Sequence, residues 1–215
     1  MFPANMPSLA HRQTTAALLL CTALFLNACS DRAPHLLPLP TDAVILAFGD
    51  SLTAGSGAGH AQSYPAVLAR LIGREVINAG VPGEISARAR ERLPALLERY
   101  RPALLVLCHG GNDLLRRLDP RALRTNLEAM ILEAQARNIP VVLLGVPEPT
   151  LFGLAPADLY EELAAQYALV YEGEVITAVE SDRQLKSDRI HPNAEGYQHI
   201  ALAVYRMLQD SGAVQ

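Results

Sequence analysis

The sequence predicts a doubly wound α/β fold, in which helices cover both faces of a parallel β-sheet. Short, continuously apolar runs recur along the chain, as expected of strands that are covered on both faces. Segments with apolar residues at helical spacing lie between these runs, and the connections are short. With 215 residues, the chain is best described as one domain with a leader. Ligands of such a fold bind at the carboxyl ends of the strands.

The first segment is predicted to be a secretory signal covering residues 1–28. Arg12 precedes an uncharged, largely apolar stretch that extends from Gln13 to Ser30. The residues Leu-Asn-Ala-Cys at 26–29 resemble the bacterial lipoprotein box, which implies that Cys29 becomes a lipidated N-terminus. An ordinary signal peptide or a single anchoring helix is the alternative, although the apolar run is short for a membrane span.

Residues 29–42 are expected to form a proline-rich tether, because Pro34, Pro38 and Pro40 disfavour a helix. The domain itself is then expected to cover residues 43–215. Ser30 stands where an aspartate would favour retention in the inner membrane, so we expect an anchor in the outer membrane of a bacterial cell envelope, facing the periplasm.

Within the domain, four strands and three helices are predicted. The strands are the apolar runs at residues 43–48, 75–78, 103–108 and 141–146. The first helix spans about residues 85–100, with a kink or a restart at Pro94. The second begins at Asp119 and Pro120, a cap followed by a first-turn proline, and the third follows Pro192.

Composition excludes several classes of function. The net charge is −4 and there is no basic stripe, so no nucleic-acid partner is expected. The histidines share no spacing that converges on a metal, and no metal or other cofactor is expected. Of the three cysteines, Cys108 lies in an apolar run and is expected to be a buried thiol, so no disulfide is predicted.

A candidate nucleophile stands at the end of the first predicted strand. Ser51 lies in Gly-Asp-Ser-Leu at residues 49–52, where the apolar run gives way to small residues. Near the C-terminus, Asp188 precedes His191 by three residues, a spacing that lets the carboxylate bind Nδ1 while Nε2 turns toward a serine. Each segment taken alone also fits an ordinary turn or helix cap.

Two further segments supply candidate donors for an oxyanion. Gly83 ends a glycine-rich segment after the second strand, and Asn112 lies in Gly-Gly-Asn-Asp at residues 110–113 after the third. The N–H groups of Ser51 and Gly83 and the Asn112 amide would together bind a tetrahedral oxyanion. Asp50 and Asp113 are expected to be turn or cap residues.

These four segments, in this order, resemble the blocks of the SGNH hydrolase superfamily, also called the GDSL esterases and lipases. Across essentially the whole domain the chain is most similar to the bacterial group called thioesterase I, lysophospholipase L1 or arylesterase. The resemblance implies a three-layer α/β/α, flavodoxin-like fold with a central parallel sheet. It also implies metal-free hydrolysis of acyl esters through an acyl-serine, with Ser51, Asp188 and His191 as the catalytic residues and Ser51, Gly83 and Asn112 as the oxyanion hole.

The substrate is expected to be a small acyl ester or thioester, because no insertion long enough to form a lid is present. The apolar loop after the fourth strand is the candidate wall for an acyl chain, with Val146, Leu151 and Phe152 as its contacts, although it also fits ordinary packing. A carbohydrate O-acetyl esterase and a non-catalytic surface lipoprotein that serves as a binding module remain alternatives. A monomer is expected.

Overall fold

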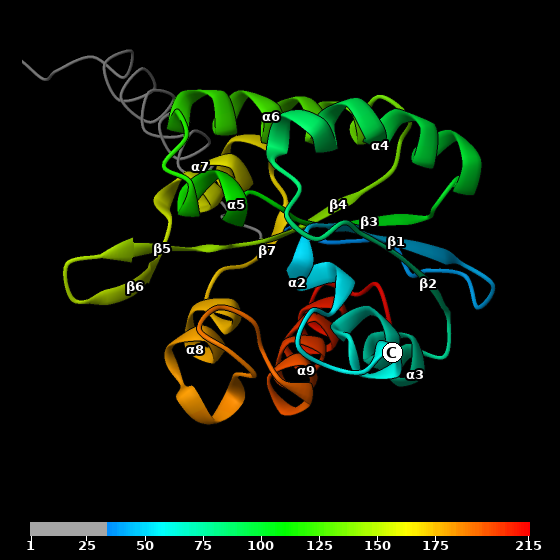
Figure 1. Cartoon of the computed structure of the whole chain (residues 1–215). Coiled ribbons are helices and arrows are strands. Elements are labelled where there is room, and N and C mark those ends of the chain that lie inside the picture. The colour runs from blue at the N-terminus through cyan, green and yellow to red at the C-terminus, as the bar shows by residue number, and fades with distance from the viewer. Residues whose placement is uncertain (1–33) are drawn as a thin grey trace, which may run out of the picture. The chain divides into compact units, whose positions relative to one another are not determined.

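The computed structural model describes residues 34–215, which form one compact unit (Figure 1). Its centre is a parallel sheet of five strands in the order β2-β1-β3-β4-β7. These strands are β1 (Val44–Gly49), β2 (Glu75–Gly80), β3 (Leu104–Cys108), β4 (Val141–Leu144) and β7 (Val170–Glu172). This strand order is the flavodoxin-like one, so the predicted fold class is confirmed.

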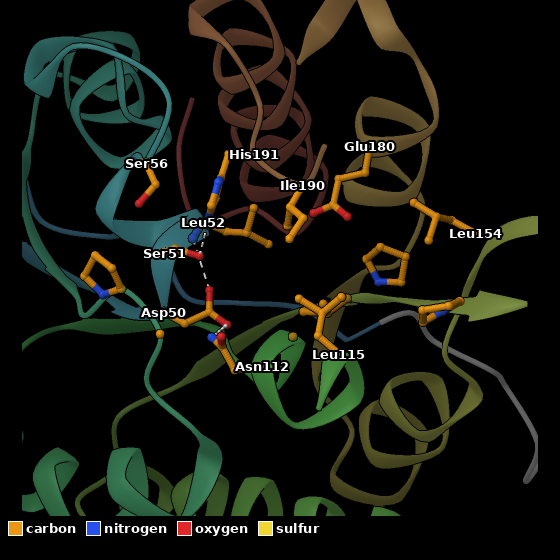
Figure 2. A pocket seen from close by; sticks show the side chains of 16 residues that line it. Asp50, Ser51, Leu52, Ser56, Asn112, Leu115, Leu154, Glu180, Ile190 and His191 are labelled. Carbon is orange, nitrogen blue, oxygen red and sulfur yellow. Dashed lines mark hydrogen bonds between the residues drawn. The ribbon is translucent and has the colours of Figure 1, made fainter. Parts of the chain in front are cut away.

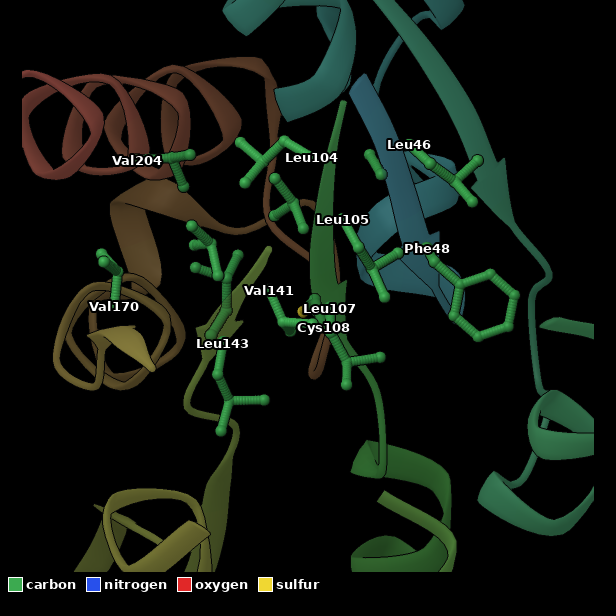
Figure 3. Close-up of a cluster of buried hydrophobic side chains, with 14 of the residues drawn as sticks. Leu46, Phe48, Leu104, Leu105, Leu107, Cys108, Val141, Leu143, Val170 and Val204 are labelled. Carbon is green, nitrogen blue, oxygen red and sulfur yellow. The ribbon is translucent and has the colours of Figure 1, made fainter. Parts of the chain in front are cut away.

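The three central strands are apolar along their whole length because helices cover both of their faces. All five residues of β3 are fully buried, and so are Ile45 to Phe48 of β1 (Figure 3). The register places Phe48 between Ala79 of β2 and Leu107 of β3. Burial of such side chains stabilises the fold by about 1.5–3 kcal/mol each, relative to leaving them exposed. The sheet therefore forms a rigid base for the loops at its carboxyl edge.

Helices pack on the two faces of the sheet as separate layers. One layer contains α4, α6 and α7, and the other contains α3, α8 and α9 (Figure 1). Their bounds are α3 (Tyr64–Ile72), α4 (Ser86–Tyr100), α6 (Pro120–Gln135), α7 (Asp158–Tyr167), α8 (Val175–Ser181) and α9 (Ala194–Asp210). Two short helices, α2 (Ser51–Ala54) and α5 (Gly111–Leu115), follow β1 and β3 directly, and the 3-10 turns η1 (His60–Gln62) and η2 (Arg183–Leu185) complete the set.

The structure differs from the sequence-based expectation at Pro94. This proline lies inside α4, which continues through it as one helix instead of restarting. Leu93 and Leu97 on the same helix are buried. Their packing compensates for the backbone hydrogen bond that a proline cannot donate.

The second half of the segment expected to be a tether, residues 29–42, packs on the domain. Leu36 N–H donates to the carbonyl of Ser211 at 2.8 Å, and Leu39 N–H donates to that of Ala213 at 2.8 Å. The Arg74 guanidinium also donates to the Leu39 carbonyl, at 2.9 Å. The prolines keep this segment extended, so its backbone groups are free to pair with the end of α9. The predicted signal at residues 1–28 and Cys29 lie outside the described residues.

Several elements were not predicted: the helices α2, α3, α5, α7 and α8, and three strands, two of which form a hairpin. The segment expected to be a loop contains an antiparallel hairpin, formed by β5 (Pro147–Thr150) and β6 (Gly153–Pro156). The third strand is the edge strand β7, which is only three residues long. Between residues 34 and 215, no helix is both long and apolar enough to cross a bilayer.

Candidate active site

Ser51 lies at the point where the chain order of the sheet reverses. β1 has β2 on one side and β3 on the other, so the loops after these three strands meet at one edge. Asp50 caps α2, accepting a hydrogen bond from Leu52 N–H at 3.1 Å, and Ser51 is the first residue of that helix. A Cβ at Gly49 would lie 2.1 Å from the Cys108 carbonyl oxygen, so only glycine allows this close strand-to-helix turn.

The structure brings Ser51, His191 and Asp188 into one hydrogen-bonded chain. Figure 2 shows its first two members, Ser51 and His191. His191 Nε2 lies 3.1 Å from Ser51 Oγ, and His191 Nδ1 lies 2.8 Å from Asp188 Oδ2. With the proton on Nδ1, Nε2 is free to accept the serine proton. The arrangement can therefore activate a serine as a nucleophile.

Asp188 is held by the backbone of its own loop. Its Oδ1 accepts hydrogen bonds from Ile190 N–H at 2.7 Å and His191 N–H at 2.8 Å. The pKa of Asp188 is well below its usual range because hydrogen bonds stabilise the charged carboxylate. The largest contribution comes from the backbone N–H of His191, followed by the His191 side chain and the backbone N–H of Ile190. The carboxylate therefore stays charged and fixes the orientation of the imidazole.

Gly83 and Asn112 reach the same pocket from the loops after β2 and β3. Gly83 has a φ of 76°, a left-handed conformation that glycine adopts without strain, and its carbonyl accepts from the Arg116 guanidinium at 2.9 Å. Asn112 Nδ2 donates to Asp50 Oδ2 at 3.3 Å (Figure 2). An amide nitrogen has two protons, so the second remains available for a bound ligand.

Asp50 has a larger role than the turn that the sequence predicts. Its buried carboxylate links the N-terminus of α2 to the Asn112 amide. Burial raises its pKa, although His109, the two hydrogen bonds and His191 act in the opposite direction. Asp113, also expected to be a turn residue, accepts from the N–H and hydroxyl of Ser86 at 2.8 and 2.6 Å. It therefore holds the start of α4 against α5.

Beside Phe48 lies a half-buried ion pair between Glu84 and Arg92. Arg92 Nη2 lies 2.6 Å from Glu84 Oε2, and its guanidinium stacks over Phe48 at 4.3 Å from the ring centre. His109 Nε2 lies 3.3 Å from the same carboxylate oxygen. Partial burial pushes the pKa of Glu84 upward, but the hydrogen bonds from His109 and Arg92 outweigh it and lower the pKa to about 2. This cluster supports the loop that carries Gly83.

The pocket beside Ser51 has a volume of about 240 Å³. One end holds Ser51, Gly83, Asn112 and His191, and most of the remaining wall is apolar. The apolar contacts come from Leu115, Val146, Pro147, Pro149, Leu154 and Ile190. A pocket of this shape places the reacting groups at one end of an apolar channel.

Two of the three predicted wall contacts do not line this pocket. Val146 lines the pocket, but Leu151 and Phe152 lie at the tip of the β5–β6 hairpin and are 90% and 96% exposed. The hairpin carries them away from the channel, and its base supplies the wall through Pro147, Pro149 and Leu154 instead. The apolar composition of this segment pointed to residues that do line the pocket. The position of the turn decides which of them face it, and that position depends on the pairing of β5 with β6.

Several pocket residues were not predicted, among them Leu115, Leu154, Ile190 and one acid. Glu180 lines the channel from α8. The sequence gives no signal for it, because a single acid in an amphipathic segment usually faces solvent. Among residues 34–215, no group of three or more His, Cys, Asp or Glu side chains is placed to hold a metal ion.

Comparison with known proteins agrees with this geometry. Residues 47–199 match the model of the GDSL-like Lipase/Acylhydrolase family. The chain is 37% identical over 160 residues to Esterase TesA of Pseudomonas aeruginosa, which covers 69% of this chain and 79% of the relative. It is 27% identical over 172 residues to Thioesterase 1/protease 1/lysophospholipase L1 of Escherichia coli K12, covering 77% of this chain and 83% of the relative.

Solved structures give the same result. A crystal structure of TesA superimposes with a TM-score of 0.72 and 31% sequence identity, covering 78% of this chain and 99% of that one. The matched range, residues 47–199, spans Ser51, Gly83, Asn112, Asp188 and His191. The chain therefore belongs to the GDSL-like lipase and acylhydrolase family, and it is a carboxylic-ester hydrolase.

Proposed function

We propose that this protein hydrolyses short and medium acyl esters through a covalent acyl-Ser51 intermediate. The observation that carries this proposal is the hydrogen-bonded chain from Ser51 through His191 to Asp188, with heavy-atom distances of 3.1 and 2.8 Å. The distance from Ser51 Oγ to His191 Nε2 is within the range for proton transfer from a nucleophile to its base. The distance from His191 Nδ1 to Asp188 Oδ2 is that of a hydrogen bond that orients the base.

In the first half of the reaction, Ser51 Oγ attacks the ester carbonyl while His191 Nε2 takes the hydroxyl proton. The carbonyl oxygen becomes an oxyanion, which the N–H groups of Ser51 and Gly83 and the Asn112 amide stabilise. Asp188 stabilises the imidazolium that forms. When the intermediate collapses, the bond to the alcohol breaks and His191 returns the proton to that leaving group.

In the second half, water hydrolyses the acyl-enzyme. His191 takes a proton from the water, whose oxygen attacks the acyl carbon at the same oxyanion site. Collapse of this second intermediate breaks the bond to Ser51 Oγ, and His191 gives the proton back to the serine. The free acid leaves, and the enzyme returns to its starting state with no cofactor consumed.

The size and lining of the pocket support acyl chains of modest length. A volume of about 240 Å³ suits a short or medium chain, and the apolar walls at Leu115 and Leu154 favour alkyl groups. The relatives are named as esterases and as a thioesterase and lysophospholipase, so thioesters and lysophospholipids are candidate substrates beside simple esters. An acetylated sugar belongs in the same substrate panel as the alternative.

Covalent labelling tests the mechanism. A fluorophosphonate probe should label the wild-type protein, and Ser51→Ala and His191→Ala should abolish the labelling. Ser56→Ala provides a matched control, because this second serine lines the same pocket, but the hydrogen bond of His191 Nε2 goes to Ser51. If folded wild-type protein is not labelled, or if Ser56→Ala removes the label, the acyl-Ser51 mechanism is wrong. The absence of labelling would favour a non-catalytic binding module instead.

We also propose that Cys29 carries a lipid that anchors the protein in the bacterial envelope, facing the periplasm from the outer membrane. The support is the Leu-Asn-Ala-Cys segment at residues 26–29, followed by Ser30. Metabolic labelling with palmitate should mark the wild-type protein and the Cys21→Ala control, but not Cys29→Ala. Palmitate on Cys29→Ala would refute the assignment.

A further inference from the structure

Glu180 is a carboxyl group in the pocket that the proposed mechanism does not use. The channel has three ionisable side chains, Asp50, Glu180 and His191. Asp50 and His191 are hydrogen-bonded to their neighbours, as described above. Glu180 has no hydrogen bond or ion pair to its side chain from any of the described residues.

The fold holds Glu180 firmly at this position. α8 buries Ile176 and Val179 on its inner face and packs against α9 and β6. The Glu180 carboxylate points into the pocket, next to Ile190 (Figure 2). In this view it lies between His191 and Leu154. Ser51, Glu180 and Leu154 line the same pocket, so an acyl chain attached to Ser51 can contact Glu180.

The Glu180 carboxyl group, which has no hydrogen-bonding partner among residues 34–215 and lies in the apolar wall of the pocket, destabilises the ligand-free protein. Burial first, and then the negative charge of Asp50, raise the pKa of Glu180 to about 7, although Lys186 acts in the opposite direction. An apolar side chain at this position would line an alkyl channel at no such cost. A polar group maintained in a cleft against this cost indicates a ligand that pairs with it.

We propose that Glu180 is a specificity-determining residue, and that it binds a hydroxyl group on the acyl chain of the substrate. The proposal rests on the acyl-Ser51 mechanism above and names its substrate class as hydroxyacyl esters. A carboxylate accepts a hydrogen bond from a hydroxyl, and a protonated carboxyl group donates one to it. A hydroxyl therefore satisfies Glu180 in both charge states, whereas an alkyl chain leaves it without a partner.

The experiment compares ethyl hexanoate with its 2-, 3- and 6-hydroxy derivatives. The specificity ratio is kcat/KM for each hydroxy ester divided by kcat/KM for ethyl hexanoate, measured from acid release. Glu180→Leu removes the carboxyl group, and Glu180→Gln keeps the shape and part of the hydrogen bonding. Glu174→Gln is the matched control, because this exposed glutamate lies at the start of α8, outside the pocket.

For at least one derivative, the specificity ratio of Glu180→Leu should be about 10-fold or more below that of the wild type. Glu180→Gln should give an intermediate ratio, and Glu174→Gln should match the wild type. Glu174→Gln should also hydrolyse ethyl hexanoate at the wild-type rate, because Glu174 lies outside the pocket. Equal ratios in the wild type and Glu180→Leu for all three derivatives would overturn the proposal.

Two measurements separate this outcome from failure of the mechanism or of folding. If fluorophosphonate still labels Ser51 while the ratios are equal, the mechanism stands and only the role of Glu180 is lost. If Glu180→Leu unfolds below the assay temperature, the specificity ratios of Glu180→Gln are compared with those of the wild type instead. Its ratio must then be lower than that of the wild type for at least one derivative, and an unchanged ratio rejects the proposal.

Discussion

His191 Nε2 lies 3.1 Å from Ser51 Oγ, although 140 residues separate them in the chain. The contact joins the loop after the first strand of the sheet to the loop before the last helix, and it turns two separate loops into one reactive pair. Four predictions follow from the geometry around this pair.

The rate of ester hydrolysis should fall in acid, because protonated His191 cannot accept the proton of Ser51. The pKa of Asp188 is held below its usual range, so Asp188 remains charged over the same pH interval and does not contribute to the fall. We expect log kcat/KM for p-nitrophenyl acetate to decrease with a slope of about one per pH unit on the acid side. Glu180→Gln serves as a control and should show the same decrease of kcat/KM in acid. A kcat/KM that does not change with pH would exclude His191 as the base.

Asn112→Ala should reduce kcat by about 100- to 1,000-fold, because it removes one side-chain donor from the oxyanion site. KM should change much less, since the oxyanion exists only in the transition state and the intermediates. Asn126→Ala is a matched control: its amide donates to Ser86 Oγ at 3.0 Å, outside the pocket. The assignment fails if both variants retain wild-type kcat in steady-state assays with the same ester.

Leu154→Asp should reduce kcat/KM for p-nitrophenyl octanoate by about 10-fold or more, because a carboxylate in the channel wall opposes an alkyl chain. The variant should hydrolyse p-nitrophenyl acetate at nearly the wild-type rate, because an acetyl group is too short to reach this wall. Phe152→Asp is the matched control from the same hairpin, and its 96% exposed side chain should leave both substrates unaffected. A selective loss of octanoate hydrolysis in Phe152→Asp alone would place the chain along the hairpin tip instead.

Glu180→Gln should stabilise the protein at pH 8 but not at pH 4. The pKa of Glu180 is about 7 in the folded protein against an ordinary value of 4.5. Between pH 4.5 and about pH 7, Glu180 keeps its proton in the folded protein but has lost it in the unfolded chain. The free energy of unfolding therefore falls as the pH rises through this interval. Glutamine avoids this loss, which is about 1–3 kcal/mol at pH 8.

Urea unfolding of the wild type and of Glu180→Gln at pH 4 and pH 8 measures the difference in their free energies of unfolding. Glu174→Gln should show no such dependence on pH, because this glutamate is exposed. A gain for Glu180→Gln that is equal at both pH values would attribute the effect to packing and not to ionisation.

The strands that form the centre of the sheet were predictable because burial on both faces requires continuous apolar runs. β3 and β4 are such runs, and each is followed by a small-residue turn. β7 was missed because three residues are too few to show a pattern. The β5–β6 hairpin was missed because Pro147 and Pro149 are uncommon in strands, and an isolated hairpin edge is one of the few places that tolerates them.

The sequence by itself determined the fold class and the candidate nucleophile, base and carboxylate, because these depend on local patterns: apolar periodicity, a serine at a strand end, and an Asp-x-x-His spacing. Only the tertiary structure decided which side chains form the pocket. Leu151 and Phe152 are as apolar as Leu154, yet strand pairing carries them outward, while the packing of α8 turns Glu180 inward. Membership of a pocket depends on contacts between distant segments, and the sequence around each residue does not encode those contacts.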